Sequence, residues 1–335
     1  MANRLKQRIA KLLPGKSTPH CRPIVSIVLV VYDMPAQAEN TVRSLLADYQ
    51  IGVSPADYEV LIVENESANN MSREFIDTLP GNFSYHLRRE TLPTPIYAIN
   101  CGIKKARGRN VCVMIDGARV VTPGVIKNTI LGHRLCERSV VTVPGYHLGF
   151  ELQQKSVSSG YTIERERELM RSINWPENGY RLFDIACFSG SCAPGFYLPH
   201  SESNCISMPR TMWNDLGGYD PRFDKRGGGV VNLDLYVRAC EYPGATHIFL
   251  HGEGTFHQFH GGVTTGGEDA EARERFIDEI MEQYRQIRGK KFESPETDPL
   301  YLGELSDPAL RFVQISADRK LERLGVHAEA QQALA

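Results

Sequence analysis

The chain has 335 residues, of which 41% are hydrophobic and 23% are charged, as is usual for a globular protein with a large core. Its 38 Lys and Arg residues nearly balance its 40 Asp and Glu residues, so the formal net charge is -2. This balance excludes a dedicated nucleic-acid-binding protein, which carries a basic excess. No apolar run reaches the roughly 20 residues that cross a bilayer, and no secretion-signal core follows the basic N-terminus, so we expect a cytoplasmic protein.

Residues 1–22 form a basic tail with a short amphipathic pattern. Leu5, Ile9 and Leu12 share one helical face, Arg and Lys residues surround it, and Pro14-Gly15 ends the pattern. The segment either makes a peripheral contact with anionic lipid at the inner face of the membrane or docks as a tail on the folded domain.

Residues 23–125 alternate strands with helices. The strand patterns cover 25–32, 58–63, 83–88 and 110–115, and the intervening helix patterns cover 35–49, 71–79 and 95–106. The strands are apolar and mostly rich in β-branched residues, as is typical of strands buried on both faces. This alternation predicts a parallel sheet. Ligands of such sheets bind beyond the carboxyl ends of the strands, where this chain has Tyr32, Glu64, Asn65 and Asp116.

The second half is less regular. Its helix patterns cover 123–137, 163–173, 270–288 and 307–324, and one strand pattern covers 139–143. Residues 217–262 hold most of the Gly and His clusters. Residues 267–335 are expected to form C-terminal helices and a polar tail.

The turn after the first strand has no phosphate-binding glycine loop. It reads Tyr32-Asp33-Met34-Pro35-Ala36 rather than G-x-G-x-x-G, and no G-x-x-x-x-G-K-[ST] sequence is present. A nucleotidyltransferase would need a basic, Gly-rich loop here, and residues 32–38 are neither. A bound phosphate must be neutralised in another way, and a divalent cation held by carboxylate and imidazole is the usual one.

Several segments carry a family resemblance through their order. They are SIVLVVY (26–32), EVLIVENES (59–67), NCGIKKARG (100–108), MIDGA (114–118), LGGYDPRF (216–223) and NLDLYVR (232–238). In this order they resemble the family 2 inverting glycosyltransferases, which have the GT-A fold and use nucleotide-diphosphate sugars. The resemblance implies an α/β, GT-A-like (Rossmann-like), mostly parallel sheet flanked by helices, with a C-terminal helical extension. It also implies a nucleotide-sugar-binding half at 23–125 and an acceptor-binding, catalytic half at 126–266.

The resemblance assigns the residues that bind the donor base. Val30 and Tyr32 fall where the first loop contacts the base. Glu64 falls where an acidic residue accepts an N–H of the base, as suits uracil, and Asn65 belongs to the same loop. From the residues alone, the alternatives are that Tyr32 packs in the core and that Glu64 is a solvated carboxylate.

Asp116-Gly117-Ala118 matches the Asp-x-Asp motif that bridges a divalent metal and the diphosphate. Ala118 cannot be a ligand, so either Arg119 offsets the diphosphate charge or the metal takes a ligand from elsewhere. Residues 251–262 hold three histidines, of which His257 best matches the histidine that completes the metal shell in many GT-A enzymes. Asp116 with His257 suits Mn²⁺ better than Mg²⁺. The alternatives are a histidine loop that binds substrate without metal and a structural turn.

The catalytic base departs from the family pattern. The family places an Asp where this chain has Asn232, which cannot take a proton. Asp234 and Glu253 are equally ranked replacements, and Glu202 is a third candidate on the acceptor side. Asp234 could instead have a structural role.

Trp175 and Tyr180 lie in an aromatic, polar segment without periodicity. Sugar rings stack on aromatic side chains, so the two could form an acceptor wall or, equally, a local hydrophobic cluster.

The resemblance implies transfer of a hexosyl unit from a UDP-linked donor to an acceptor hydroxyl with inversion. The acceptor would be a saccharide or glycolipid, and the setting would be surface polysaccharide or glycoconjugate synthesis. The alternative is a catalytically inactive nucleotide-sugar-binding or scaffold protein with the same fold, because Ala118 and Asn232 both depart from the pattern.

Overall fold

A mostly parallel sheet forms the centre of the molecule. The computed structural model describes residues 22–90, 92–260 and 270–326, and within them eight strands pair in the order β12–β10–β6–β9–β4–β1–β2–β3. The strands are β1 (Val25–Val31), β2 (Tyr58–Asn65), β3 (Phe83–Arg88), β4 (Asn110–Met114), β6 (Ser139–Thr142), β9 (Cys205–Pro209), β10 (Thr246–Leu250) and β12 (Leu300–Leu302). Only β9 among these strands runs antiparallel to its neighbours, β4 and β6. The predicted α/β fold is confirmed, including all four strands expected in the first half.

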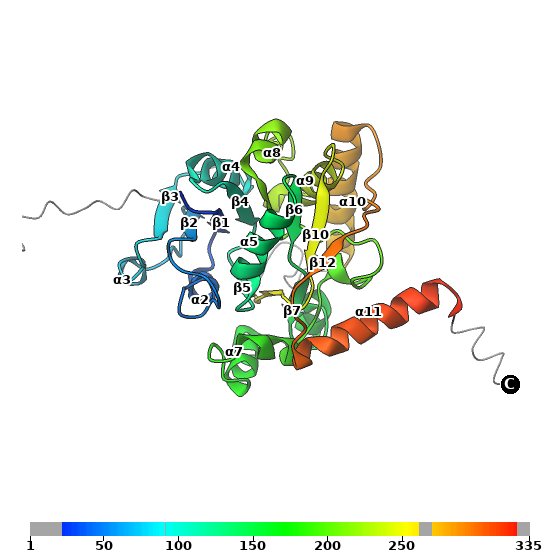
Figure 1. Ribbon diagram of the computed structural model, residues 1–335, viewed down its shortest axis with the longest axis horizontal. Helices are drawn as coiled ribbons and strands as arrows, with labels where there is room; N and C mark the ends of the chain where they lie inside the picture. The colour runs from blue at the N-terminus through cyan, green and yellow to red at the C-terminus, as the bar shows by residue number, and fades with distance from the viewer. Residues whose placement is uncertain (1–21, 91, 261–269, 327–335) are drawn as a thin grey trace, which may run out of the picture.

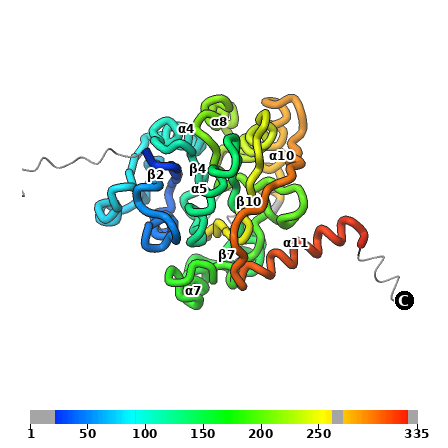
Figure 2. The backbone as a smooth tube through the Cα atoms, viewed as in Figure 1, coloured from blue at the N-terminus to red at the C-terminus, as the bar shows by residue number. Residues whose placement is uncertain are grey.

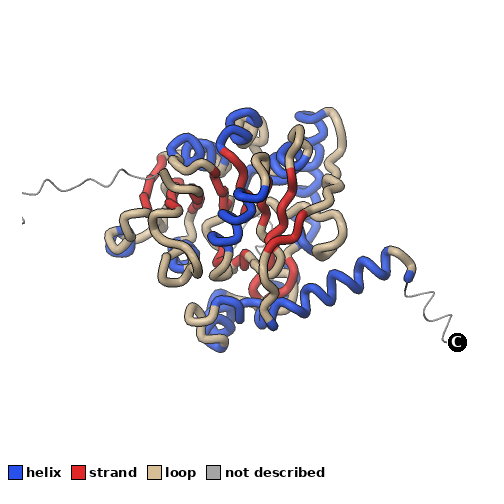
Figure 3. Tube along the Cα trace, viewed as in Figure 1, coloured by secondary structure: helices blue, strands red, loops and turns tan. Residues whose placement is uncertain are grey.

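Helices cover both faces of this sheet (Figure 1 and Figure 3). One face carries α2 (Pro35–Arg43), α3 (Arg73–Ile76) and α5 (Val125–Leu135), and the other carries α4 (Ile96–Lys105), α8 (Arg210–Leu216), α9 (Val231–Cys240) and α10 (Ala270–Arg288). Side chains of β1 alternate between the two cores: Ile27 and Leu29 face the first set of helices, and Val28 and Val30 face the second. Burial on both faces explains why the strand reads as one apolar run.

A second, smaller sheet lies beside the carboxyl edge of β4. Within the described ranges it has four strands in the order β5 (Arg119–Val121), β11 (Thr255–His257), β7 (Gly145–Leu148) and β8 (Ala186–Phe188). The sequence patterns did not predict these strands. Its core is aromatic: the Tyr146 ring lies 5.2 Å from that of Phe183, 5.0 Å from that of Phe256 and 4.7 Å from that of Phe312.

Helical segments pack around this second sheet. They are α6 (Gln153–Ser156), η1 (Val157–Ser159), α7 (Ile163–Ser172), η2 (Gly179–Ile185), η3 (Gly190–Cys192), η5 (Asp307–Ala309) and α11 (Leu310–Arg323), while η4 (Arg226–Gly228) precedes α9. Phe312 and Ser316 anchor the start of α11, and its far end extends away from the body of the molecule (Figure 2). The helix α10 has the predicted bounds. The expected N-terminal helix lies outside the described residues, and no helix in the described ranges is long and apolar enough to cross a membrane.

Two histidines, the buried His247 and the partly buried His133, contact strands of the main sheet and should make the fold sensitive to acid. His133 lies 2.7 Å from the Ser139 and Ser207 hydroxyls, and His247 lies 2.8 Å from the Thr142 hydroxyl. Burial lowers the pKa of His133 to about 3 and that of His247 to about 3. The unfolded chain, with a histidine pKa near 6.5, therefore binds more protons between these values, and the free energy of unfolding falls as the pH falls below about 6.5.

We expect each of these histidines to cost about 3 kcal/mol of stability by pH 4 relative to pH 7. Urea unfolding at pH 7, 6, 5 and 4 measures this loss, and His247→Gln should flatten the slope between pH 6 and 4. A free energy of unfolding that stays constant from pH 7 to pH 4.5 would contradict the expectation.

Candidate functional site

A cavity of about 750 Å³ opens at the carboxyl edge of the main sheet. The ends of β1, β2 and β4 and the small sheet contribute Val30, Tyr32, Asn65, Asp116, Arg119, His147 and His257 to its wall. The loops around 189–191 and 226–232 and the helix α10 line the rest, the helix through Phe276 and Ile280. The cavity is therefore where parallel sheets of this kind bind ligands.

The small sheet brings distant segments together in this cavity. The strand β5 begins three residues after Asp116, and it pairs with β11 so that Arg119 lies opposite His257. On the other side of β11, His257 lies opposite His147. The structure thereby places the Asp116 carboxylate 2.9 Å from His257 Nε2. The convergence expected from the sequence is present in the geometry.

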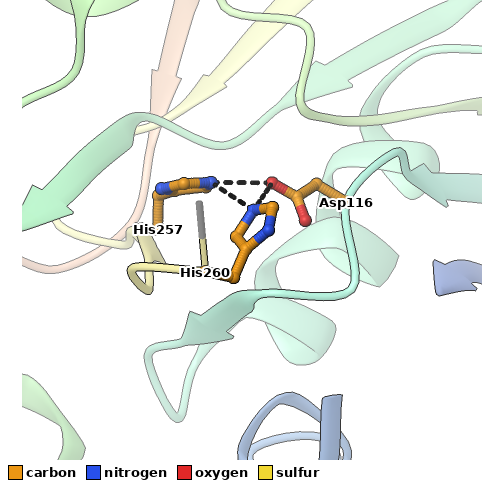
Figure 4. A group of neighbouring side chains, drawn as sticks. All are labelled: Asp116, His257 and His260. Atoms are coloured by element: carbon orange, nitrogen blue, oxygen red, sulfur yellow. Dashed lines mark hydrogen bonds and ion pairs between the residues drawn. The ribbon is translucent and has the colours of Figure 1, made fainter. Parts of the chain in front are cut away.

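A third side chain, His260, completes a compact cluster with Asp116 and His257 (Figure 4). His260 Nε2 lies 3.2 Å from His257 Nε2 and 3.7 Å from Asp116 Oδ2. A six-coordinate ion with bonds of about 2.1 Å holds adjacent ligand atoms about 3 Å apart. One carboxylate and two imidazoles at these separations can therefore hold one divalent cation, and the donor set favours Mn²⁺ over Mg²⁺.

The protonation of His257 also fits a cation. Its Nδ1 lies 2.6 Å from Oε1 of Gln153, which can only accept, so the proton is on Nδ1 and Nε2 carries a lone pair. Burial lowers the pKa of His257 to about 4, which keeps the ring neutral at pH 7. The Nε2 lone pair then faces the carboxylate of Asp116, and two acceptors this close need a cation or a proton between them.

Asp116 is the negatively charged member of the cluster. Burial opposes ionisation of Asp116, but the His260 imidazole beside it holds the pKa of the carboxyl below its usual range. Burial likewise opposes charging of His260, yet the Asp116 carboxylate raises the pKa of that imidazole. The Asp116 carboxylate thus stays ionised and available as a ligand.

Arg119 is a buried cation with unused hydrogen-bond donors. It is 7% exposed and lines the cavity, and its Nε and Nη1 have no hydrogen-bond partner. Its nearest anion is Asp116, at 3.8 Å from Nε, which is too long for a hydrogen bond. Buried donors without partners are costly, so an anion such as a phosphate would stabilise this arrangement.

The two residues predicted to contact the donor base at the end of β2 face different ways. Glu64 does not line the cavity, because its carboxylate accepts hydrogen bonds from Met71 N–H and the Tyr85 hydroxyl. Asn65 does line it, and its Oδ1 is buried without a hydrogen-bond partner. Alternate residues of a strand point to opposite faces, which corrects the expectation for Glu64 and leaves Asn65 facing the cavity. Tyr32 lines the cavity with 58% of its surface exposed.

Gly117 and Ala118 pack next to Asp116 and do not line the cavity. A side chain at Gly117 would meet Val31 Cγ2 at 2.9 Å, so glycine lets this turn lie close to β1. Ala118 is fully buried, and its N–H donates to Asp116 Oδ1 at 3.0 Å. These two residues orient Asp116 rather than line the cavity.

The three carboxylates suggested as catalytic bases lie outside the cavity wall. Glu253 is buried and accepts hydrogen bonds from Asn128 at 2.9 Å and Tyr180 at 3.0 Å. Asp234 is buried against Arg238 and Arg288, each at 2.8 Å. Because a base must reach the acceptor oxygen, neither can act in this arrangement.

Glu202 is also buried, and it accepts hydrogen bonds from the Ser191 hydroxyl at 2.7 Å and the Asn204 amide at 2.8 Å. Ser191 and Asn204 line the cavity, so Glu202 supports its wall without contacting the interior. A catalytic or direct acceptor-binding role for Glu202 therefore has no support in this geometry.

The structure does not bring the expected acceptor wall to the cavity. Trp175 packs with Tyr49, their ring centroids 6.2 Å apart, and the Tyr180 hydroxyl donates to Glu253. Both belong to the edge of the aromatic core of the second sheet. This corrects the expectation of an acceptor wall in favour of the local hydrophobic cluster.

Several cavity residues were missed from the sequence. His260 lay within the recognised histidine run, so its spacing of three from His257 was a usable signal. His147 and Asn204 come from a short strand and a loop with no pattern of their own. Asn232 lines the cavity, and its side-chain amide donates to the Ser203 hydroxyl at 3.0 Å.

Part of this chain resembles known proteins in sequence, and most of it has distant structural relatives. Residues 26–190 match the model of glycosyl transferase family 2, and no curated protein sequence matches the chain. Among solved structures, S. aureus TarS 1–349 in complex with UDP-GlcNAc is 11% identical, with 89% of this chain and 72% of that chain covered and a TM-score of 0.49. The mannosyltransferase PcManGT from Pyrobaculum calidifontis, in complex with GDP-Man and Mn²⁺, is 13% identical, with 88% and 72% covered and a TM-score of 0.48. Residues 26–190 of the chain therefore form a glycosyl transferase family 2 domain.

Proposed function

We propose that this protein transfers a hexosyl unit from a nucleotide-diphosphate sugar, UDP-linked, to an acceptor hydroxyl with inversion at the anomeric carbon. The observation that carries the proposal is the cluster of Asp116, His257 and His260 beside the buried Arg119, whose Nε and Nη1 have no hydrogen-bond partner. A ligand that unites a divalent cation with a negatively charged group would satisfy all four side chains. The diphosphate of a nucleotide sugar is such a ligand.

Asp116, His257 and His260 would hold the cation, with Mn²⁺ favoured by the two imidazoles. When bound, the cation supplies Lewis-acid stabilisation of the leaving diphosphate. Arg119 would donate Nε–H and Nη1–H to diphosphate oxygens. Replacing the second acidic residue of the motif by Ala118 and adding Arg119 makes the site more positive, which favours the departing anion.

The base would bind at the ends of β1 and β2. Tyr32 offers an exposed ring for stacking, and the unpartnered Oδ1 of Asn65 can accept one N–H. Uracil presents a single imide N–H, which suits this acceptor. The donor assignment to UDP therefore rests on Asn65 rather than on Glu64.

Inversion by direct displacement needs a base for the acceptor hydroxyl proton as the new C–O bond forms. Besides Asp116, the carboxylates that line the cavity in the described part of the chain are Asp33, Glu66 and Glu90. Glu90 lies in the segment whose Pro93 carbonyl accepts the Gly227 N–H at 2.7 Å. Among these carboxylates we assign the base to Glu90, because it is the one nearest in sequence to Pro93, which contacts the chain just before Asn232.

The acceptor, the pathway and the location in the cell are proposed from the sequence and the family. We propose a saccharide or glycolipid acceptor in surface polysaccharide or glycoconjugate synthesis. We further propose a cytoplasmic protein whose basic residues 1–22 make peripheral contact with the membrane. The apolar side chains of Phe276 and Ile280 in the cavity wall suit the ring faces or lipid portion of such an acceptor.

Thermal shift with UDP-, GDP- and dTDP-sugars, each with and without Mn²⁺, tests the donor assignment. We expect UDP-sugars with Mn²⁺ to raise the melting temperature most, because donor and cation bind the folded state together. Release of UDP on addition of acceptor would then establish turnover. A shift without UDP release under any acceptor would favour the inactive scaffold, and no shift with any nucleotide sugar would overturn the proposal.

A further inference from the structure

We propose that Gln153 is a positioning residue that fixes the His257 ring so that Nε2, and not Nδ1, is the atom offered to the cation. The inference rests on the cation site of the proposed function. It adds Gln153 as the residue that orients one ligand of that site. Gln153 opens the short helix α6, far from His257 in sequence, and carries no motif.

Gln153 is fully buried and contacts His257 at two points. Its Oε1 lies 2.6 Å from His257 Nδ1, and its Nε2 donates to the backbone carbonyl of His257 at 2.9 Å. Its backbone N–H donates to His147 Nδ1 at 3.1 Å. One residue therefore binds the ring and the backbone of His257 and the neighbouring imidazole.

The orientation of the Gln153 amide follows from its partners. Nε2 faces two acceptors, the His257 carbonyl and Glu166 Oε2, the latter at 3.4 Å. A flipped amide would turn its oxygen toward both of these acceptors, which is unfavourable. Oε1 must therefore face the His257 ring, and it holds the proton on Nδ1.

Glu166 contacts the backbone between His257 and His260, as Gln153 contacts that of His257. Its carboxylate is buried and accepts the Phe259 N–H at 2.8 Å as well as the Gln153 amide. Phe259 directly precedes His260, so this network, built from α6 and α7, braces the segment that carries both imidazoles. Partners of this kind typically change metal affinity by about 10–100-fold when removed.

The test compares Mn²⁺ affinity in the full chain, measured by electron paramagnetic resonance of free Mn²⁺ without donor. Gln153→Met keeps the volume and removes the acceptor, so we expect its Mn²⁺ affinity to fall about 10–100-fold. Gln153→Glu keeps an acceptor for Nδ1–H, and its protonated form can still donate to the His257 carbonyl, so it should lose much less. The matched control is Gln50→Met, which removes another buried glutamine, hydrogen-bonded to Ser44, Thr122 and Ile126 and not to the cluster, and should leave Mn²⁺ affinity unchanged.

Long-range ¹H–¹⁵N NMR of the histidine rings reports which nitrogen of His257 carries the proton. General destabilisation of the fold would not change this result. We expect wild-type His257 to carry its proton on Nδ1 and Gln153→Met to populate both tautomers. If wild type binds no Mn²⁺, the cation site of the proposed function fails. If wild type binds Mn²⁺ and Gln153→Met binds it equally, or wild-type His257 carries its proton on Nε2, the role of Gln153 is overturned while the proposed function stands.

Discussion

His257→Ala is expected to lower kcat/KM for sugar transfer by at least about 100-fold and to lower Mn²⁺ affinity by a similar factor. The imidazole is one of three ligands in the cluster with Asp116 and His260, so its loss leaves two ligand atoms for the cation. A 100-fold loss corresponds to about 2.7 kcal/mol of transition-state stabilisation, within the range for removing one preorganised electrostatic contact. UDP release and Mn²⁺ titration measure the two effects separately.

His251→Ala is the control for this experiment. His251 belongs to the same histidine run, but its ring packs with Tyr197 and Tyr301, at 6.1 Å and 5.4 Å, and it does not line the cavity. We expect its activity to stay near that of wild type. Retained UDP release by His257→Ala, or by wild type after thorough chelation of divalent ions, would contradict a catalytic cation at this site.

The main sheet was predictable because its strands are long, apolar and separated by helices with clear periodicity. The bounds of α10 were predicted to the residue, and β3 lies at its approximate predicted position. The small sheet was not, because β5, β8 and β11 have three residues each and β7 has four. Segments this short show too few alternations to distinguish a strand from a loop. Yet this sheet brings Arg119 and His257 together.

The order of the sequence motifs predicted several residues that face the cavity. It could not predict which carboxylates are buried and hydrogen-bonded to other side chains. Asp234 pairs with Arg288, which lies 54 positions further along the chain. No local sequence pattern predicts such a pair. Glu64 and Asn65 illustrate a finer limit. The strand β2 continues to Asn65, so alternation along it decides which of the two side chains faces the ligand.

Arg119→Met is expected to have opposite effects on activity and stability. The guanidinium is buried with unused donors, so the donor-free protein bears the cost of desolvating a charge that has only a distant partner in Asp116. Replacing it by an apolar side chain of similar length should raise the melting temperature by about 2–4 °C. The same change would remove the two hydrogen bonds that we propose between Arg119 and the diphosphate, and we expect donor affinity to fall about 10–100-fold.

Arg119→Lys separates charge from geometry in this prediction. Lysine keeps the positive charge but lacks the planar fork that can bond two diphosphate oxygens, so we expect only partial recovery of donor affinity. Arg181→Gln, which removes a half-exposed arginine paired with Asp184, serves as the control and should change neither property. Calorimetric titration with UDP and thermal unfolding without it measure the two effects. If Arg119→Met binds UDP as wild type does, the guanidinium does not contact the diphosphate, and its unused donors need another ligand.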